Sequence, residues 1–199
     1  RVASAARARY ALAAHTAGVS TEPHAHDFFI AVAFPDDQTR ILPYNRVVAG
    51  LTGQTASQIL DAVSTRLPVT PSSEASPPKG VVAMYLGGRW YHVGLNYVRE
   101  SSADQASGLD AALLQEQVLG PVLNVRDIRT DPRVRFVGGV RGTNELERLV
   151  DSGEAGVAFS LAPVTVSELF AVADSGGTMP PKSTWFEPKL LDGLLTHVI

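Results

Sequence analysis

The chain reads GVVAMYLGGRWYHV at residues 80–93. Two runs rich in β-branched and aromatic residues flank Gly87-Gly88, and a two-residue glycine turn between such runs is typical of a β-hairpin. His92 alternates with Tyr91 and is therefore expected to face solvent or to cap a sheet edge. This hairpin is the clearest secondary-structure signal in the chain, and the other expected elements are placed around it.

Phe28–Phe34 is a short, continuously apolar run, which predicts a strand buried on both faces, and Ala155–Leu161 predicts another buried strand. Pro35-Asp36-Asp37 is a turn signal, so residues 40–42 are expected to return as the hairpin partner of the first run. Leu190–Ile199 is expected to close the chain as a strand or a short helix.

Two expected helices begin at residues that can cap the helix N-terminus. Thr55 is a good N-cap before the helical spacing of residues 59–63, and Thr165 with Glu168 three residues later resembles a capping box. Further helices are expected at residues 1–17, 109–119 and 144–150. The order of elements predicts an α+β fold, in which a mixed β-sheet is flanked by helices.

The domain organisation follows from the same pattern. Residues 1–18 are expected to be a helix that belongs to a truncated preceding part, and residues 19–199 to form an α+β C-terminal domain. Residues 68–79 hold four prolines and few apolar side chains, which predicts a flexible loop within that domain.

Composition excludes several classes of function. The chain has 199 residues, 45% hydrophobic and 19% charged, with a net charge of −3. An acidic balance argues against nucleic acid as a partner. The absence of cysteine excludes disulfides, thiolate metal sites and a cysteine nucleophile. No apolar run approaches the ~18 residues of a membrane span, so no membrane partner and a cytoplasmic location are expected.

His24 and His26 lie two residues apart and would share one face of a strand, which is compatible with metal ligation. No third ligand stands near them in the sequence. We therefore expect no metal site.

A proline-rich stretch, residues 176–189, lies between a helical pattern and the final apolar run. Pro180-Pro181 stiffens it, so that Lys182, Ser183 and Thr184 would present one charge and two hydroxyls at fixed positions. That combination suits a phosphate or a carboxylate. The alternative is a surface loop that Trp185 and Phe186 pin to the core.

A second candidate anion site follows the expected strand at residues 134–137. Glycines there precede a helix whose first turn holds Thr143, a geometry in which free backbone amides bind anions, and Arg141 adds charge. Asn45 and Arg46 stand at an expected strand end and are further candidates. The alternative for Arg46 is a surface ion pair with Asp36 or Asp37. The ligand- or phosphate-binding candidates are Arg1, Asn45, Arg46, Gly139, Arg141, Thr143, Lys182, Ser183 and Thr184.

Four strings together resemble one family: Phe28–Phe34, Arg40–Val48, Leu113–Leu119 and Met179–Lys189. It is the bacterial and archaeal family called domain of unknown function 1015, also described as SpoOJ/ParA/ParB/RepB-like. The resemblance implies a protein roughly twice as long, whose missing N-terminal half is similar to ParB and sulfiredoxin nucleotide-binding domains. That half carries an Asp-Gly-His-His-Arg motif, and Arg1 resembles its arginine.

The same fold resembles free-serine kinases, which implies a nucleotide-dependent phosphotransferase or phosphatase acting on serine or phosphoserine. ATP or ADP with Mg²⁺ would be the cofactor of the full-length protein. The partners would be the missing N-terminal half and a small-molecule ligand. The resemblance also implies that this fragment alone is inactive. A general base is needed as well, and Glu116 and Glu187 are the candidates within the chain.

Two other functions remain open. One is a ParB-like module whose binding is controlled by a nucleotide. The other is a structural companion that closes over the site of the missing half and has no activity of its own.

Overall fold

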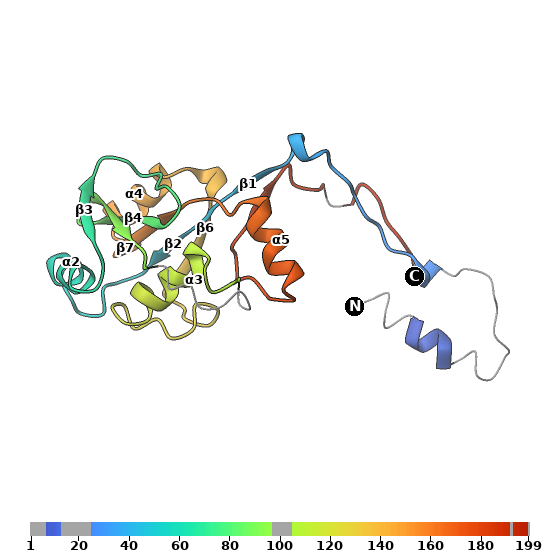
Figure 1. The fold of residues 1–199 in the computed structure, drawn as a ribbon, viewed down its shortest axis with the longest axis horizontal. Helices are drawn as coiled ribbons and strands as arrows, with labels where there is room; N and C mark the ends of the chain where they lie inside the picture. The colour runs from blue at the N-terminus through green and yellow to red at the C-terminus, as the bar shows by residue number, and fades with distance from the viewer. Residues whose placement is uncertain (1–6, 13–24, 97–104, 192, 199) are drawn as a thin grey trace. The chain divides into compact units, whose positions relative to one another are not determined.

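The computed structural model describes residues 7–12, 25–96, 105–191 and 193–198. The chain divides into two compact units. Unit 1 comprises Arg1–Thr39 with Pro188–Ile199, and unit 2 comprises Arg40–Glu187 (Figure 1). Each unit has its own internal contacts.

Unit 2 is built on a six-stranded sheet of order β3-β5-β4-β7-β2-β6. Every pairing in this sheet is antiparallel. The strands are β2 (Tyr44–Val48), β3 (Val69–Ser72), β4 (Val81–Leu86), β5 (Arg89–Gly94), β6 (Val134–Gly138) and β7 (Val157–Leu161). The α+β class with flanking helices is confirmed, and the sheet is antiparallel rather than mixed.

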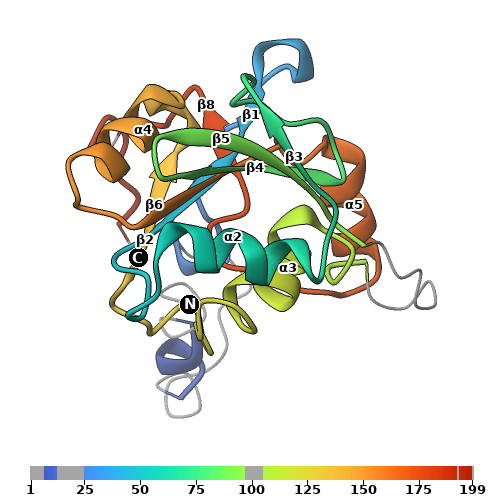
Figure 2. The same cartoon turned by 90° about the vertical axis from the view of Figure 1, so that its left-hand side faces the viewer.

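Helices cover both faces of the sheet (Figure 2). One face packs on α2 (Ala56–Ser64), α3 (Asp110–Leu114) and the π-helical turn η3 (Gln115–Leu119). The other face packs on α4 (Asn144–Asp151) through its buried leucines. Because neighbouring strand residues point to opposite faces, Val48 belongs to the first core and Val47 to the second.

The local signals of the sequence are confirmed in unit 2. Thr55 caps α2 and Thr165 caps α5 (Val166–Asp174), each in a full capping box. The hairpin forms with Leu86 opposite Arg89, and Gly87 and Gly88 adopt φ of 59° and 78°. Two successive positive φ values define the turn that matches the twist of a hairpin, and glycine adopts them without a Cβ penalty. His92 Nε2 lies 2.9 Å from the carbonyl oxygen of Glu74.

Part of the loop predicted at residues 68–79 is a β-strand, although it contains a proline. Residues 69–72 form β3, which pairs with β5 at the edge of the sheet. Pro71 cannot donate to a ladder, and an edge strand has one side on which no donor is needed. Composition alone therefore gave the wrong prediction for these four residues.

The predicted partner of residues 40–42 is wrong. They form β1 (Arg40–Leu42), which pairs antiparallel with β8 (Trp185–Glu187) in a separate two-stranded sheet. The true partner is about 145 residues away, and a turn signal reports only on neighbours in sequence. This pairing brings the proline-rich loop against the start of β2.

Unit 1 contains the 3₁₀ turns η1 (Ala25–Asp27) and η2 (Asp36–Gln38), and residues 7–12 are helical. Residues 28–34 form no strand, and their large side chains are 41–78% exposed, so the buried strand predicted there is wrong. The described part of the last ten residues forms neither strand nor helix, which corrects the prediction for Leu190–Ile199. Arg1 and His24 fall outside the described residues, as does most of the expected helix at 1–17.

Within the described ranges, no helix is both long enough and apolar enough to cross a membrane.

Candidate anion-binding cleft

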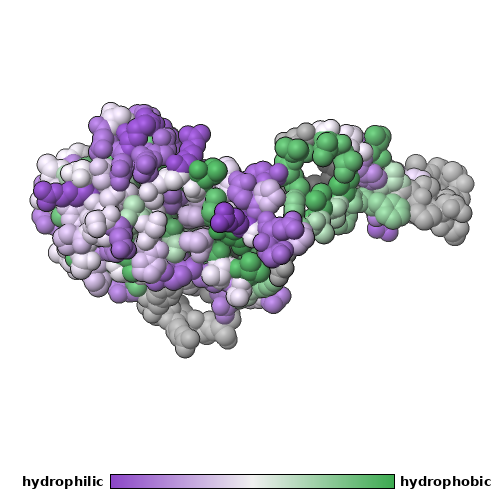
Figure 3. Space-filling view, turned by 90° about the horizontal axis from the view of Figure 1, so that it is seen from above, coloured by the Kyte–Doolittle hydropathy of each residue, from purple (hydrophilic) through white to green (hydrophobic). Residues whose placement is uncertain are grey.

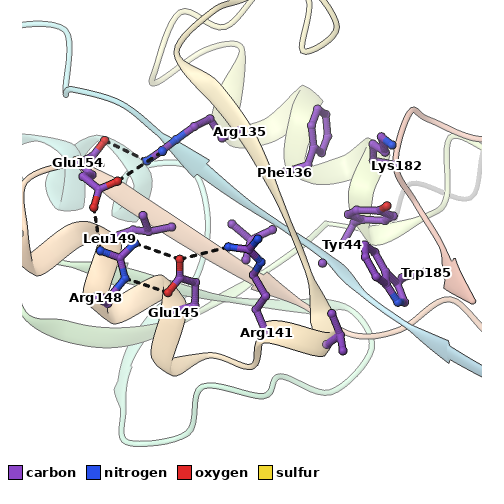
Figure 4. A pocket seen from close by; sticks show the side chains of 13 residues that line it. Tyr44, Arg135, Phe136, Arg141, Glu145, Arg148, Leu149, Glu154, Lys182 and Trp185 are labelled. Atoms are coloured by element: carbon purple, nitrogen blue, oxygen red, sulfur yellow. Dashed lines mark hydrogen bonds and ion pairs between the residues drawn. The ribbon is translucent and has the colours of Figure 1, made fainter. Parts of the chain in front are cut away.

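A cleft of about 500 Å³ lies beside the edge strand β6 of unit 2. Charged side chains of β6 and α4 stand on one side of it, and Lys182, Tyr44 and Trp185 stand on the other (Figure 4). Arg141, from the 3₁₀ turn η4 (Gly139–Arg141), lies between the two groups. The lining residues are Tyr44, Arg135, Phe136, Val137, Gly138, Val140, Arg141, Glu145, Arg148, Leu149, Glu154, Lys182 and Trp185.

The charge of this cleft is positive, since four cationic side chains face two carboxylates. Arg148 is hydrogen-bonded to both carboxylates: it donates to Glu145 at 2.9 and 3.0 Å and to Glu154 at 2.8 Å. Arg141 is 69% exposed at the side chain and lies 3.7 Å from Glu145. Arg141 and Lys182 are therefore the cations best placed to receive an added anion.

Hydrogen bonds from Arg148 lower the pKa of Glu145 and of Glu154 below their ordinary values. The same bonds raise the pKa of Arg148. At neutral pH the carboxylates are ionised, and the cleft keeps its excess of positive charge.

The aromatic side of the cleft is rigidly built. Tyr44 and Trp185 meet edge to face with ring centroids 5.3 Å apart. The Nζ atom of Lys182 lies 5.4 Å from the centroid of the Tyr44 ring, within the range of a cation–π contact. Lys182 itself has φ of 53°, a left-handed conformation that costs a non-glycine residue free energy.

Glycines allow the two sides to come together. A Cβ on Gly138 would lie 2.6 Å from the indole of Trp185, and one on Gly139 would lie 2.8 Å from Pro43. Gly139 thus serves the close approach of two backbone segments, and Gly138 seats the aromatic side of the cleft.

Asn45 and Arg46 are buried and do not line the cleft. Asn45 is 2% exposed and accepts from the backbone N–H of Leu161. Arg46 is 1% exposed, which does not fit a surface ion pair. Its guanidinium donates to the carbonyl oxygens of Tyr44 at 2.6 Å and of Pro181 and Lys182 at 3.4 Å each.

Ser183, Thr143 and Thr184 do not line the cleft either. Ser183 is buried and donates to the carbonyl oxygen of Pro180 at 2.6 Å. Thr143 caps α4 through its backbone and makes no side-chain capping bond. Thr184 lines neither this cleft nor the small cavity that Arg46 and Ser183 share.

The two carboxylates considered as bases also stand apart from it. Glu116 is exposed on η3, and Glu187 accepts a hydrogen bond from the indole Nε1 of Trp185. Neither lines the cleft. Both roles therefore remain predictions, as does that of Arg1.

Two further cations of the cleft, Arg135 and Arg148, are not among the residues predicted from the sequence, although they supply half of its cationic side chains. A signal was present for Arg148, because Glu145 and Arg148 are three residues apart on a helix and so share one face. For Arg135, alternation along β6 gives an outward-facing position next to buried Val134.

No group of three or more histidine, aspartate or glutamate side chains suited to hold a metal ion occurs in the described part of the chain. The side chain of His26 is not among those described. The expectation of no metal site therefore remains a prediction.

Fold and cleft define an α+β protein with a cation- and aromatic-lined site on one sheet edge. The family model that matches the chain is the one described as "Protein of unknown function (DUF1015)", over residues 1–112. The chain belongs to this family. A comparison with curated protein sequences finds no match.

Solved structures resemble the chain at low identity. A free serine kinase in complex with AMP matches with a TM-score of 0.47 and 12% identity, over 76% of this chain and 55% of that one. A conserved hypothetical protein from Pyrococcus furiosus matches with a TM-score of 0.44 and 13% identity, over 76% and 57%. The chain spans little more than half the length of the structures that it matches.

Proposed function

We propose that the cleft binds the phosphate groups of a nucleotide or of a phosphorylated small metabolite. In this proposal the longer polypeptide is a phosphotransferase or phosphatase acting on a metabolite such as serine or phosphoserine, and this chain completes its substrate site. The observation that supports it is the excess of cations in a cleft of about 500 Å³ beside two aromatic rings. Phosphoryl transfer depends mostly on positioning and on stabilising negative charge, which such a site can supply.

The residues that line the cleft fit the nucleotide of the implied cofactor but not its Mg²⁺ ion. Arg141 and Lys182 suit the phosphates of ATP or ADP, and Tyr44 or Trp185 offers a face on which a base can stack. Mg²⁺ prefers carboxylate oxygens, but the two carboxylates of the cleft already accept hydrogen bonds from Arg148. We therefore assign no residue to the metal.

Arg141→Ala and Lys182→Ala should each weaken binding of pyrophosphate or ADP to the full chain by about tenfold, because each removes one charge-assisted hydrogen bond. Isothermal titration calorimetry at two salt concentrations measures the change, and the losses should shrink at high salt. Arg129→Ala is the matched control, since Arg129 pairs with Asp127 outside the cleft. Equal losses in all three variants would contradict the proposal.

Glu145→Gln should act in the opposite direction in the same titration. It removes a negative charge and releases Arg141 and Arg148 from a carboxylate. Protonation of Glu145 by acid would have the same effect as this substitution. It requires a pH below the ordinary glutamate pKa, because the pKa of Glu145 in the folded protein is lowered. Affinity should therefore rise in Glu145→Gln at neutral pH. In the wild type Glu145 stays ionised down to about pH 5, and the weaker binding expected on acidification comes from protonation of the ligand phosphate, whose second pKa is about 6.

A second role, as a structural companion, is favoured by unit 1. Ten of its large apolar side chains are 41–80% exposed: Phe28, Phe29, Ile30, Val32, Phe34, Leu190, Leu191, Leu194, Leu195 and Val198. They belong to unit 1, where Figure 3 shows a green apolar area, and several line a groove of about 450 Å³. Exposed apolar patches of this kind mark interaction surfaces. The occupant that we propose is the N-terminal half implied by the family resemblance.

The double variant Leu191→Ser with Leu194→Ser should destabilise a polypeptide that carries both halves and should leave the unfolding midpoint of residues 1–199 unchanged. The reason is that these side chains, 76% and 73% exposed in this chain, would be buried only in the longer one. Urea unfolding of both polypeptides gives the comparison. Phe170→Ser, in exposed α5 of unit 2, is the control. An unchanged midpoint in the longer polypeptide would refute this occupant.

A further inference from the structure

Arg46 carries its charge into the interior of unit 2. The side chain is 1% exposed on β2, the second strand from the cleft edge of the sheet. Burial lowers the pKa of its guanidinium to about 10, so the group still carries a full charge at neutral pH. A buried charge is unfavourable unless hydrogen bonds compensate it, so the positions of its partners matter.

Two of those partners are the carbonyl groups on either side of the Lys182 Cα atom. One Nη atom donates to the carbonyl oxygens of Pro181 and Lys182, each at 3.4 Å. Ser183 closes the same turn through its bond to Pro180 at 2.6 Å. These contacts surround Lys182, whose φ of 53° is left-handed, and a strained residue persists only where its surroundings fix it.

We propose that Arg46 is a positioning residue that fixes the backbone at Lys182 and thereby directs the Lys182 ammonium into the cleft. It acts on the ligand through Lys182 and does not touch the ligand itself. The expected effect of Arg46 on ligand binding rests on the function proposed for the cleft. The expected effect of Arg46 on the backbone and side chain of Lys182 does not.

The surroundings of the guanidinium explain why arginine is needed. On one side lies the Phe136 ring, with its centroid 5.4 Å from the guanidinium carbon. Arg46 also lines a cavity of about 10 Å³, room for one water molecule, together with Lys79, Asp110 and Ser183. The Nε atom has no protein partner among the described residues, and a water in this cavity would satisfy it. A planar guanidinium carries five N–H donors that point in different directions, whereas a lysine ammonium is a single compact charge and cannot reach all of these partners at once.

Arg46→Met in the full chain tests the positioning directly by NMR. In the wild type the Lys182 ε-protons should be shifted upfield by the ring current of Tyr44, since Nζ lies 5.4 Å from the ring centroid. Lys182→Ala assigns the resonance. We expect the shift to vanish in Arg46→Met and to be partly retained in Arg46→Lys, which also serves if the methionine variant does not fold. A shift that keeps its full wild-type size in folded Arg46→Met or Arg46→Lys would overturn the inference.

A double-mutant cycle with pyrophosphate tests the consequence for binding. Arg46→Met should lower affinity about five- to tenfold in the wild-type background and should have no further effect in Lys182→Ala, because residues that act through one another are not additive. Additive losses would show that Arg46 acts by another route and would refute the inference. If wild-type protein does not bind pyrophosphate, the proposed function fails, and the NMR shift alone decides the positioning role.

Discussion

Phe159→Ala is expected to lower the free energy of unfolding by about 3–5 kcal/mol, a large part of the roughly 5–15 kcal/mol that stabilises a typical protein. Phe159 is 0% exposed on β7, and in the sheet it lies between Arg46 of β2 and Met84 of β4. Its ring belongs to the core that joins the sheet to α2 and α3. The loss combines the transfer free energy of the ring with the cost of the cavity that it leaves.

Urea unfolding followed by tryptophan fluorescence measures this loss, and the slope should remain that of the wild type. Phe170→Ala provides the matched control: the same atoms are removed from a side chain that is 60% exposed on α5, and the change should stay within about 0.5 kcal/mol. Similar losses in the two variants would mean that Phe159 is not in the core that the structure shows.

The sequence predicted those elements whose signals are local. A capping box needs only four consecutive residues, and both Thr55 and Thr165 form one. The hairpin needs only two adjacent glycines between strand-forming runs. Ala155–Leu161 was read as buried from its apolar run, and β7 is buried along its whole length.

Elements whose state depends on distant parts of the chain could not be predicted in this way. Residues 28–34 and β7 have the same apolar pattern, yet only β7 has neighbours in the six-stranded sheet. Likewise, nothing near residues 40–42 indicates a partner at residues 185–187. Periodicity reports which residues would suit a strand, and pairing depends on the rest of the fold.

The cleft shows the same division. Arg141 and Lys182 were predicted from separate stretches, and the structure brings both to one cleft through β6 and the β1–β8 pairing. Arg46 was predicted as a ligand-binding residue from its place at a strand end. Its burial depends on Phe136 across the sheet and on the Pro181-Lys182 turn, which is 135 residues away along the chain. Charged residues thus indicated two stretches that reach this cleft, while the three-dimensional contacts decide which side chains line it.

Gly138→Ala is expected to cost about 1–3 kcal/mol of stability and to weaken pyrophosphate binding, because one added methyl group displaces Trp185. The backbone of Gly138 has φ of −61° and ψ of 138°, which alanine adopts freely. In an open position the substitution would even stabilise by restricting the unfolded chain. Here the Cβ atom would lie 2.6 Å from two ring carbons of the indole, so overpacking outweighs that gain.

Gly108→Ala separates these two effects, since the nearest atom to its Cβ is 3.8 Å away and the change should be neutral or slightly stabilising. Trp185→Leu removes the ring carbons that the new methyl group meets, so it should restore part of the stability that Gly138→Ala loses. Thermal unfolding of the wild type, Gly138→Ala, Trp185→Leu and the double variant gives the interaction free energy between positions 138 and 185. A favourable interaction means that Gly138 is present to seat the indole. Strict additivity would mean that Trp185 does not pack against Gly138 in solution, and the aromatic side of the cleft would lose its support.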